Sequence, residues 1–322
     1  MTLSTEMILT LQQLDGIGNK TILKIANQAP TSIGDFGQLC DFWKSLKGKK
    51  IESFSKSDLE YAYQTALRIK ARCEQEGVGI ISYYDNDFPK TLRDCTDETG
   101  KLNPPIILYY RGNVKGLEKP GVAVIGTREP TMNGIQAGKY FSSEFAKRGY
   151  NIVSGLAIGC DAAGHQGALE VGGVTTAFLA NGLDWESIYP KENLELAKDI
   201  VEKGGLLLSE YPIGQSCGRY GLVARDRLQA GLSYATVVIQ TGEKGGTMHA
   251  VNATIKSGKL LLAVEYKSDE DCIHEKVQGN IKLIQEGKAY PLRSASINEA
   301  FLMCEKVIRS EVKIVKQTSL FD

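Results

Sequence analysis

The feature that most constrains this chain is a series of short, mostly apolar runs that lack polar alternation and are separated by segments long enough for helices. The runs between residues 121 and 265 are Val122–Ile125, Asn151–Ser154, Thr175–Leu179, Leu206–Ser209, Ala235–Ile239 and Lys259–Val264. The helices expected between them lie at 133–148, from about 161, and at 194–203, 225–231 and 247–256. Strands that are apolar on both faces are typical of a parallel sheet covered by helices on both sides. Because crossovers between parallel strands are right-handed, the pattern predicts an α/β fold with a doubly wound, extended Rossmann-like, mostly parallel sheet.

The segments before and after this series follow other patterns. Ile8, Leu11 and Leu14 recur at helical spacing, whereas 79–84 and 106–110 are short β-rich runs. After Val264 the regularity fades, apart from one stretch with amphipathic helical spacing. The expected organisation is a helical domain at 1–76, a linker with edge strands at 77–120, a Rossmann-like domain at 121–290, and a C-terminal helix (297–310) with a mobile tail at 291–322.

Charge, cysteine content and the N-terminal segment argue against a uniformly basic protein, a metal-binding protein and a secreted or membrane protein. Among the 322 residues, 38 Lys and Arg balance 38 Asp and Glu, so any affinity for nucleic acid must come from local clusters of charge. The seven Cys form no C-x-x-C pair and only three His are present, which predicts reduced thiols and no metal site. The N-terminal segment lacks the pattern of a signal peptide, and no apolar run is long enough for a membrane span. We therefore expect a cytoplasmic protein without membrane contacts.

The loop after the first run carries parts that suit a phosphate. Gly126, Thr127 and Arg128 place a glycine, a hydroxyl and a positive charge before a helix. The loop is not G-x-G-x-x-G, and Ser154 stands where a dinucleotide-binding protein has a ribose-binding acid, so an NAD-dependent enzyme is disfavoured. A tight turn with a surface Arg is an equally good interpretation of this loop taken alone.

The loop after the second run ends in a possible acid–base pair. Ser154–Asp161 again supplies glycines before a helix, and His165 follows Asp161 by one turn. Such a pair is able to act as a general base, but no nucleophile lies nearby in the sequence. The favoured interpretation is that Asp161 and His165 support the loop by internal hydrogen bonds.

Two later loops add cations. Arg225 and Arg227 are two residues apart, so they share no helix face unless the helix begins between them. An irregular segment could direct both at one phosphate, and the alternative is a salt bridge to Asp226 or another acid. The loop after the fifth run supplies Lys244 and Thr247 around glycines. Since the carboxyl ends of parallel strands meet at one edge, four such loops together favour a polyphosphate strand over a single mononucleotide.

The motifs that carry a family resemblance are spread over most of the chain. They are Val122–Arg128, Ser154–Asp161 with His165, Ala180–Asp184 with Tyr189–Pro190, Leu208–Pro212, Arg225–Ser233 and Gly279–Gly287. In their order and number they resemble the DNA-processing protein A family (DprA, also called Smf), bacterial single-stranded DNA-binding proteins that load the RecA recombinase. The resemblance implies an extended Rossmann sheet that binds single-stranded DNA at the strand ends, with no catalytic reaction and no cofactor. It also implies a homodimer and RecA as a partner.

The resemblance further implies a set of DNA contacts. By motif they are Gly126, Thr127, Arg128, Gly155, Ala157, Gly159, Arg219, Tyr220, Arg225, Arg227, Lys244, Gly246 and Thr247. This chain departs from the family pattern at Asp226, where Asn is usual, and at Leu222, where an aromatic residue usually stacks on a base. The added carboxylate is expected to weaken phosphate binding, and Tyr220 is the candidate replacement for the stacking residue. Gln240 and Gly245 also replace the usual Glu and Ser.

Two features outside the series suggest further interactions. Gly16-Ile17-Gly18 resembles the hairpin of a helix–hairpin–helix motif, for which DNA binding and a plain structural turn are about equally good interpretations. The C-terminal peptide resembles the Q-x-x-L-F motif that docks on the bacterial sliding clamp, through Gln317, Leu320 and Phe321.

The alternative function is a nucleotide phosphoribohydrolase on a similar sheet. Lys244–Thr247 resembles the P-G-G-x-G-T loop of those enzymes. They place a catalytic Glu shortly after this loop, whereas Met248–Val251 contains none. A non-enzymatic DNA-binding protein is therefore the leading hypothesis.

Overall fold

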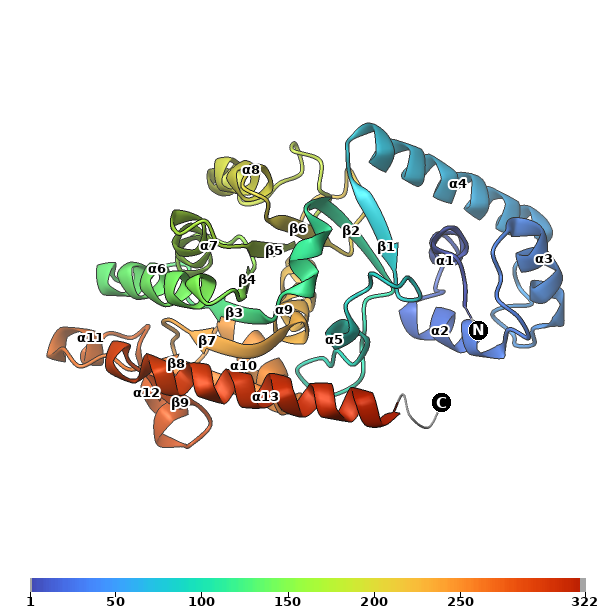
Figure 1. Ribbon diagram of the computed structural model, residues 1–322. Coiled ribbons are helices and arrows are strands. Elements are labelled where there is room, and N and C mark those ends of the chain that lie inside the picture. Colours follow the sequence, from blue (N-terminus) through green and yellow to red (C-terminus); the bar gives the residue numbers. More distant parts are fainter. Residues whose placement is uncertain (1, 319–322) are drawn as a thin grey trace.

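The computed structural model describes the backbone of residues 2–318 and the side chains of residues 2–218 and 221–310. Its strands are β1 (Gly79–Ser82), β2 (Ile107–Gly112), β3 (Gly121–Ile125), β4 (Asn151–Ser154), β5 (Thr175–Leu179), β6 (Leu206–Ser209), β7 (Ser233–Val238), β8 (Leu260–Val264) and β9 (Tyr290–Leu292). Within the described range they form one nine-stranded sheet, in the order β1-β2-β6-β5-β4-β3-β7-β8-β9 (Figure 1).

The sheet is parallel except at one edge. From β6 to β9 every neighbouring pair is parallel, whereas β1 pairs with β2, and β2 with β6, in the antiparallel sense. All residues of β3, β4 and β5 are buried, as expected for strands covered on both faces. The predicted mostly parallel, doubly wound sheet is therefore confirmed. The prediction missed β9, because three residues, two of them exposed, carry no periodic signal.

Helices cover both faces of the sheet. They are α1 (Thr5–Gln12), α2 (Asn19–Gln28), α3 (Phe36–Ser45), α4 (Lys56–Gln75), α5 (Lys90–Arg93), α6 (Met132–Lys147), α7 (Cys160–Glu170), α8 (Leu194–Glu202), α9 (Arg219–Leu232), α10 (Thr247–Lys256), α11 (Asp269–Ile273), α12 (Gln278–Gln285) and α13 (Ile297–Thr318). The apolar residues of α6, α7, α8 and α13 pack on one face, and those of α5, α9, α10 and α12 pack on the other. The core therefore consists of two apolar layers, one on each face of the sheet.

The N-terminal segment is helical, as the sequence predicts. Helices α1–α4 lie together beyond the β1 edge of the sheet (Figure 1). Helix α4 begins with a capping box in which Ser55 and Asp58 each bond the other's backbone N–H. The predicted stripe is buried at Ile8, Leu11 and Leu14, in an apolar cluster that continues to Tyr109 of β2. The domain boundaries proposed from the sequence stay predictions.

The C-terminal part contains more regular structure than the sequence suggests. Helices α11 and α12 follow β8, and α13 begins at the predicted residue 297 but continues to residue 318 rather than 310. None of the helices in the described part of the chain combines the length and apolar character that crossing a bilayer requires.

Candidate functional site

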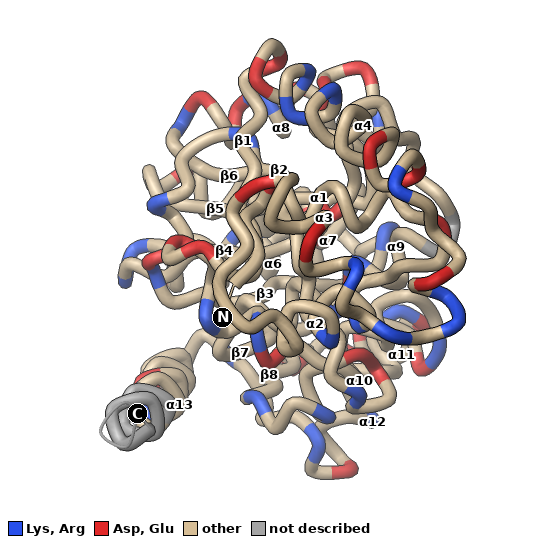
Figure 2. The backbone as a smooth tube through the Cα atoms, turned by 90° about the vertical axis from the view of Figure 1, so that its right-hand side faces the viewer, with Lys and Arg blue, Asp and Glu red and all other residues tan. Residues whose placement is uncertain are grey.

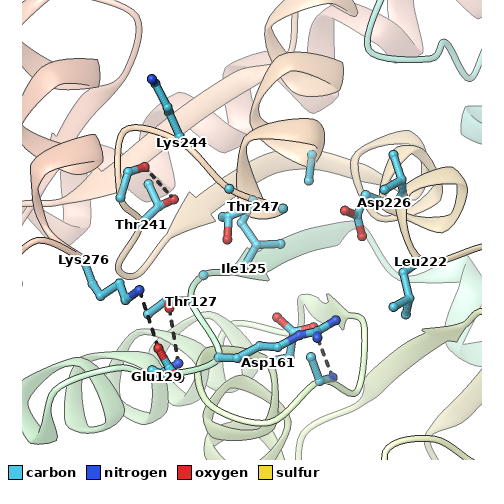
Figure 3. A pocket seen from close by; sticks show the side chains of 18 of the residues that line it. Ile125, Thr127, Glu129, Asp161, Leu222, Asp226, Thr241, Lys244, Thr247 and Lys276 are labelled. Carbon is cyan, nitrogen blue, oxygen red and sulfur yellow. Dashed lines mark hydrogen bonds and ion pairs between the residues drawn. The ribbon is translucent and has the colours of Figure 1, made fainter. Parts of the chain in front are cut away.

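The cavity that contains most of the predicted site residues lies where the order of the parallel strands reverses. The chain runs from β3 outward to β4, β5 and β6, and then returns to place β7 on the other side of β3. In open α/β sheets such a switch point opens a crevice at the carboxyl ends of the two central strands. Here a cavity of about 970 Å³ occupies that place (Figure 3). The predicted site residues that line it are Gly126, Thr127, Arg128, Ala157, Asp161, Arg225, Lys244, Gly246 and Thr247.

The loop after β3 is built on close contact with the end of β7. Thr127 N–H donates to the Gln240 carbonyl at 2.7 Å, and a Cβ on Gly126 would lie only 2.8 Å from that oxygen. The Gln240 side chain joins the loop again, since its amide accepts from Thr131 N–H at 2.9 Å and donates to Thr131 Oγ1 at 2.8 Å. Gln240 therefore fixes the backbone of the loop that carries Arg128.

The loop after β4 is held by Asp161. This buried carboxylate accepts from Gly155 N–H at 3.1 Å and from Ala157 N–H at 3.3 Å. Burial raises its pKa, while the nearby Arg225 charge opposes that shift. Gly159 has a φ of 82°, and a Cβ there would lie 2.6 Å from the Thr127 carbonyl, so glycine allows the two loops to touch.

His165 bonds to a strand and not to Asp161. Its Nδ1 lies 2.6 Å from Thr175 Oγ1, which itself donates to the Ile152 carbonyl. Burial lowers the pKa of His165 to about 3, so the ring is neutral at pH 7. His165 is absent from the cavity lining, and no hydrogen bond joins it to Asp161 in the described structure. The two residues therefore form no acid–base dyad.

Arg225 is buried at the cavity wall. Helix α9 begins at Arg219, six residues earlier than predicted, so Arg225 and Arg227 both lie within it and diverge. Arg225 Nη1 donates to the Phe178 carbonyl at 2.7 Å, and its Nε lies 3.2 Å from Asp226 Oδ1. A Cβ on Gly155 would overlap this guanidinium, which gives Gly155 a role in seating Arg225.

Arg227 points away from the cavity, and the expected phosphate contact has to be corrected. Its Nη1 and Nη2 donate to the two carboxylate oxygens of Glu210, each at 2.8 Å, and its Nε donates to the Asn103 carbonyl at 3.0 Å. The side chain is only 6% exposed and does not line the cavity. The alternative left open at the sequence level, a salt bridge to an acid, therefore holds for Arg227.

The loop after β7 supplies an exposed cation and a helix start. Helix α10 begins at Thr247, which places its first N–H groups at the cavity. Lys244 is exposed, as is Arg128, and neither side chain has an ion-pair or hydrogen-bond partner among the described residues. Figure 3 shows Lys244 extending away from the loop, whereas Lys276 is directed toward Glu129.

Over the part of the chain that the structure describes, the cavity does not lie in a continuous basic surface, and several of its cations are paired with neighbouring carboxylates. Figure 2 shows Lys and Arg interspersed with Asp and Glu over the molecule. In the cavity, Lys276 pairs with Glu129 at 3.5 Å and with Glu275 at 3.1 Å. The cations that remain without a carboxylate partner among the described residues are Arg128 and Lys244, on the loops after the two central strands. This arrangement suits an anion at the switch point.

Some expected residues fall elsewhere. The side chains of Arg219, Tyr220 and Gln317, and residues Leu320 and Phe321, lie outside the described part of the chain. Sequence reasoning missed several lining residues, among them Gln229, Glu275, Lys276 and Gln278. Lys276 had no signal, because it lies after Val264 where the periodic pattern fades.

Comparison with known proteins identifies the family. The family model described as DNA recombination-mediator protein A matches residues 79–301, which include the whole cavity. The chain belongs to the DNA recombination-mediator protein A family. DNA processing protein DprA of Bacillus subtilis is 31% identical over 72% of this chain and 74% of its own length. Protein Smf of Synechocystis is 38% identical over 54% of this chain and 43% of its own length.

Solved structures of the recombination-mediator family agree with the fold. DNA processing protein A from Streptococcus pneumoniae matches with a TM-score of 0.69 and 26% identity, over 91% of this chain and 95% of that one. The Helicobacter pylori protein, described for its single-stranded DNA binding mode, matches with a TM-score of 0.58 and 28% identity, over 73% and 96%. The family resemblance read from the sequence is therefore confirmed.

Proposed function

We propose that this chain binds single-stranded DNA along the cavity at the switch point, protects it, and loads RecA recombinase onto it in DNA recombination and transformation. The observation that carries the proposal is the pair of exposed, unneutralised cations Arg128 and Lys244 at the carboxyl ends of β3 and β7. The single-stranded DNA binding described for the Helicobacter pylori relative supports it. The same proposal takes the protein to act without catalysis, in the cytoplasm and as a homodimer.

The proposed DNA contacts follow from which groups line the cavity. Arg128, Lys244 and the N–H groups at the start of α10 bind phosphates of the DNA backbone. The contacts that the proposal retains are Gly126, Thr127, Arg128, Ala157, Arg225, Lys244, Gly246 and Thr247, together with Arg219 and Tyr220 by family resemblance. Gly155 enters as the residue that leaves room for the Arg225 guanidinium, and Gly159 as the residue that lets the loops after β3 and β4 touch.

The test is binding of labelled oligonucleotides to the full chain, followed by fluorescence anisotropy over a salt series. We expect single-stranded DNA to bind more tightly than duplex. Arg128→Ala and Lys244→Ala should each weaken binding to all sequences alike and reduce the salt slope by about 0.7. Lys198→Ala on α8, far from the cavity lining, is the matched control and should leave both values unchanged. Absence of binding, or Arg128 and Lys244 variants that behave like the control, would overturn the proposal.

The remaining parts of the proposal have their own measurements. Sedimentation should give the mass of a dimer, and the protein should accelerate RecA-dependent strand exchange on protein-coated single strands. Incubation with nucleoside monophosphates should release no free base, because residues 248–251 in α10 carry no carboxylate. Removal of residues 317–322 should abolish retention on immobilised sliding clamp, if the C-terminal peptide is a clamp motif.

A further inference from the structure

Asp226 presents a carboxylate oxygen to the cavity. Figure 3 shows its carboxylate directed toward the side chains of Thr247 and Ile125 across the cavity. Its Oδ1 lies 3.2 Å from Arg225 Nε and accepts from Gln229 Nε2, also at 3.2 Å. Its Oδ2 has no partner among the described residues. Oδ1 thus accepts one hydrogen bond and keeps a lone pair free, and Oδ2 keeps both of its lone pairs, so each oxygen is still able to accept from a ligand.

Gln229 adds a second incomplete acceptor at the same place. It follows Asp226 by three residues on α9, lines the cavity, and is only 2% exposed. Its Nε2 donates to Asp226, but its buried Oε1 has no partner among the described residues. Buried acceptors normally receive a hydrogen bond. Asp226 and Gln229 each keep an acceptor without a donor among the described residues, so a ligand that carries hydrogen-bond donors fits this place.

The ligand group at Asp226 cannot be a phosphate. An ionised carboxylate only accepts hydrogen bonds and repels a phosphate, whereas Arg128 and Lys244 attract it. A strand bound in the cavity therefore presents a base to Asp226 while its backbone follows the cations. Ile125, Leu222 and Ala250 supply apolar lining surface against which the faces of a base can pack.

We propose that Asp226 reads the base held in this cavity and selects guanine, an inference that rests on the proposed single-strand binding. The Watson–Crick edge of guanine offers the N1–H and an N2 amino hydrogen side by side, which match the two oxygens of one carboxylate. Thymine offers one N–H between two carbonyl oxygens, and adenine and cytosine place an amino group beside a ring acceptor. Guanine alone pairs with the carboxylate through two donors.

The charges around Asp226 set the pH range of this selection. Arg225 on its own helix, Asp161 on α7, His249 on α10 and Arg128 after β3 all act on it, and burial raises its pKa to about 6. At pH 7.5 the carboxylate is ionised and accepts both guanine donors. At pH 5 it is mostly protonated, so the preference for guanine should shrink.

The experiment compares the affinities of the full chain for labelled single strands of equal length by fluorescence anisotropy at pH 7.5. One strand is all thymine, and others replace isolated thymines by guanine, adenine, cytosine or inosine. We expect guanine to bind about tenfold more tightly than thymine, in line with one bidentate base contact. Inosine keeps N1–H but lacks the amino group, so it should lose most of that gain.

Two substitutions test whether the Asp226 carboxylate is the cause of the preference for guanine. Asp226→Asn has the same shape, and it should bring the guanine-to-thymine ratio close to one. Glu243→Gln removes another carboxylate of the cavity lining; it should raise affinity for all strands and leave the ratio unchanged. Thermal unfolding of each variant checks that it is folded.

The outcomes separate this inference from the function on which it rests. Failure of every strand to bind removes the proposed single-strand binding itself. Tight binding without a preference for guanine overturns the reading of bases by Asp226. A preference that persists in Asp226→Asn, or that inosine fully retains, overturns it as well.

Discussion

Arg227 and Glu210 are joined by two parallel hydrogen bonds of 2.8 Å, Nη1 to Oε2 and Nη2 to Oε1. The Arg227 side chain is 6% exposed and that of Glu210 is 18% exposed, so the pair is largely shielded from water. Through Nε, Arg227 also bonds the Asn103 carbonyl. The pair therefore fastens α9 both to the segment after β6 and to the connection before β2, and it acts on stability rather than on DNA.

Glu210→Ala should destabilise the fold, because it leaves the Arg227 charge buried without its partner. The expected fall in the free energy of unfolding is about 3 kcal/mol, measured by urea denaturation. Glu195→Ala breaks the exposed Lys198–Glu195 pair on α8 and should cost less than about 1 kcal/mol. Equal effects of the two substitutions would contradict a structural role for the buried pair.

Gly155→Ala should displace Arg225 from the cavity wall. A methyl group at this position would overlap the Arg225 guanidinium, which then has to give up its 2.7 Å bond to the Phe178 carbonyl. We expect a loss of about 1–3 kcal/mol in the free energy of unfolding, typical of overpacking in a buried site.

Gly34→Ala is the control for that substitution, since a Cβ there meets only Gln38 Oε1 at 3.8 Å. It should change the free energy of unfolding by less than about 1 kcal/mol. If the two alanine variants have the same stability, the Gly155 backbone has shifted to accommodate the methyl group and glycine is not needed to seat Arg225.

The sequence predicted those parts of the site that depend on local pattern and on the strand-end rule. Apolar runs located β3 and β7, and the meeting of parallel strand ends brought Arg128 and Lys244 to one cavity. The start of α9 was missed because Gly218 provides no side-chain cap, so the divergence of the two arginines was missed with it. The Gln240–Thr131 contact joins residues 109 positions apart, which no local pattern reveals.

Asp226→Asn should stabilise the protein near neutral pH. Burial raises the pKa of Asp226 to about 6, above its unfolded value near 4, so the folded state binds the extra proton. The native protein therefore loses stability as pH rises from about 4 through 6 and carries the full penalty above that range. We expect the variant to be more stable by about 3 kcal/mol at pH 7.5, because one pKa unit corresponds to about 1.4 kcal/mol.

The stability difference between wild type and Asp226→Asn should fall below about 1 kcal/mol near pH 4, where the wild-type carboxyl is protonated in the folded state and about half protonated in the unfolded state. Urea denaturation of both proteins between pH 4 and 8 measures it. A difference that stays constant over this range would mean that the carboxylate is as well solvated in the folded chain as in the unfolded one.

His165 should make the folded state less stable as pH falls, whereas Asp226 makes it less stable as pH rises. Burial lowers its pKa to about 3, below the unfolded value of about 6.5, so the unfolded state binds the extra proton between these values. The contribution of His165 is fully present above pH 6.5 and is lost at about 1.4 kcal/mol per pH unit below it. In His165→Gln, which keeps an amide able to bond Thr175 Oγ1, unfolding free energy should fall less steeply from pH 6.5 to 4.5, by about 2 kcal/mol over that interval. Parallel curves for wild type and variant would show that His165 is protonated in the folded state, and hence that its ring is not held neutral between α7 and β5.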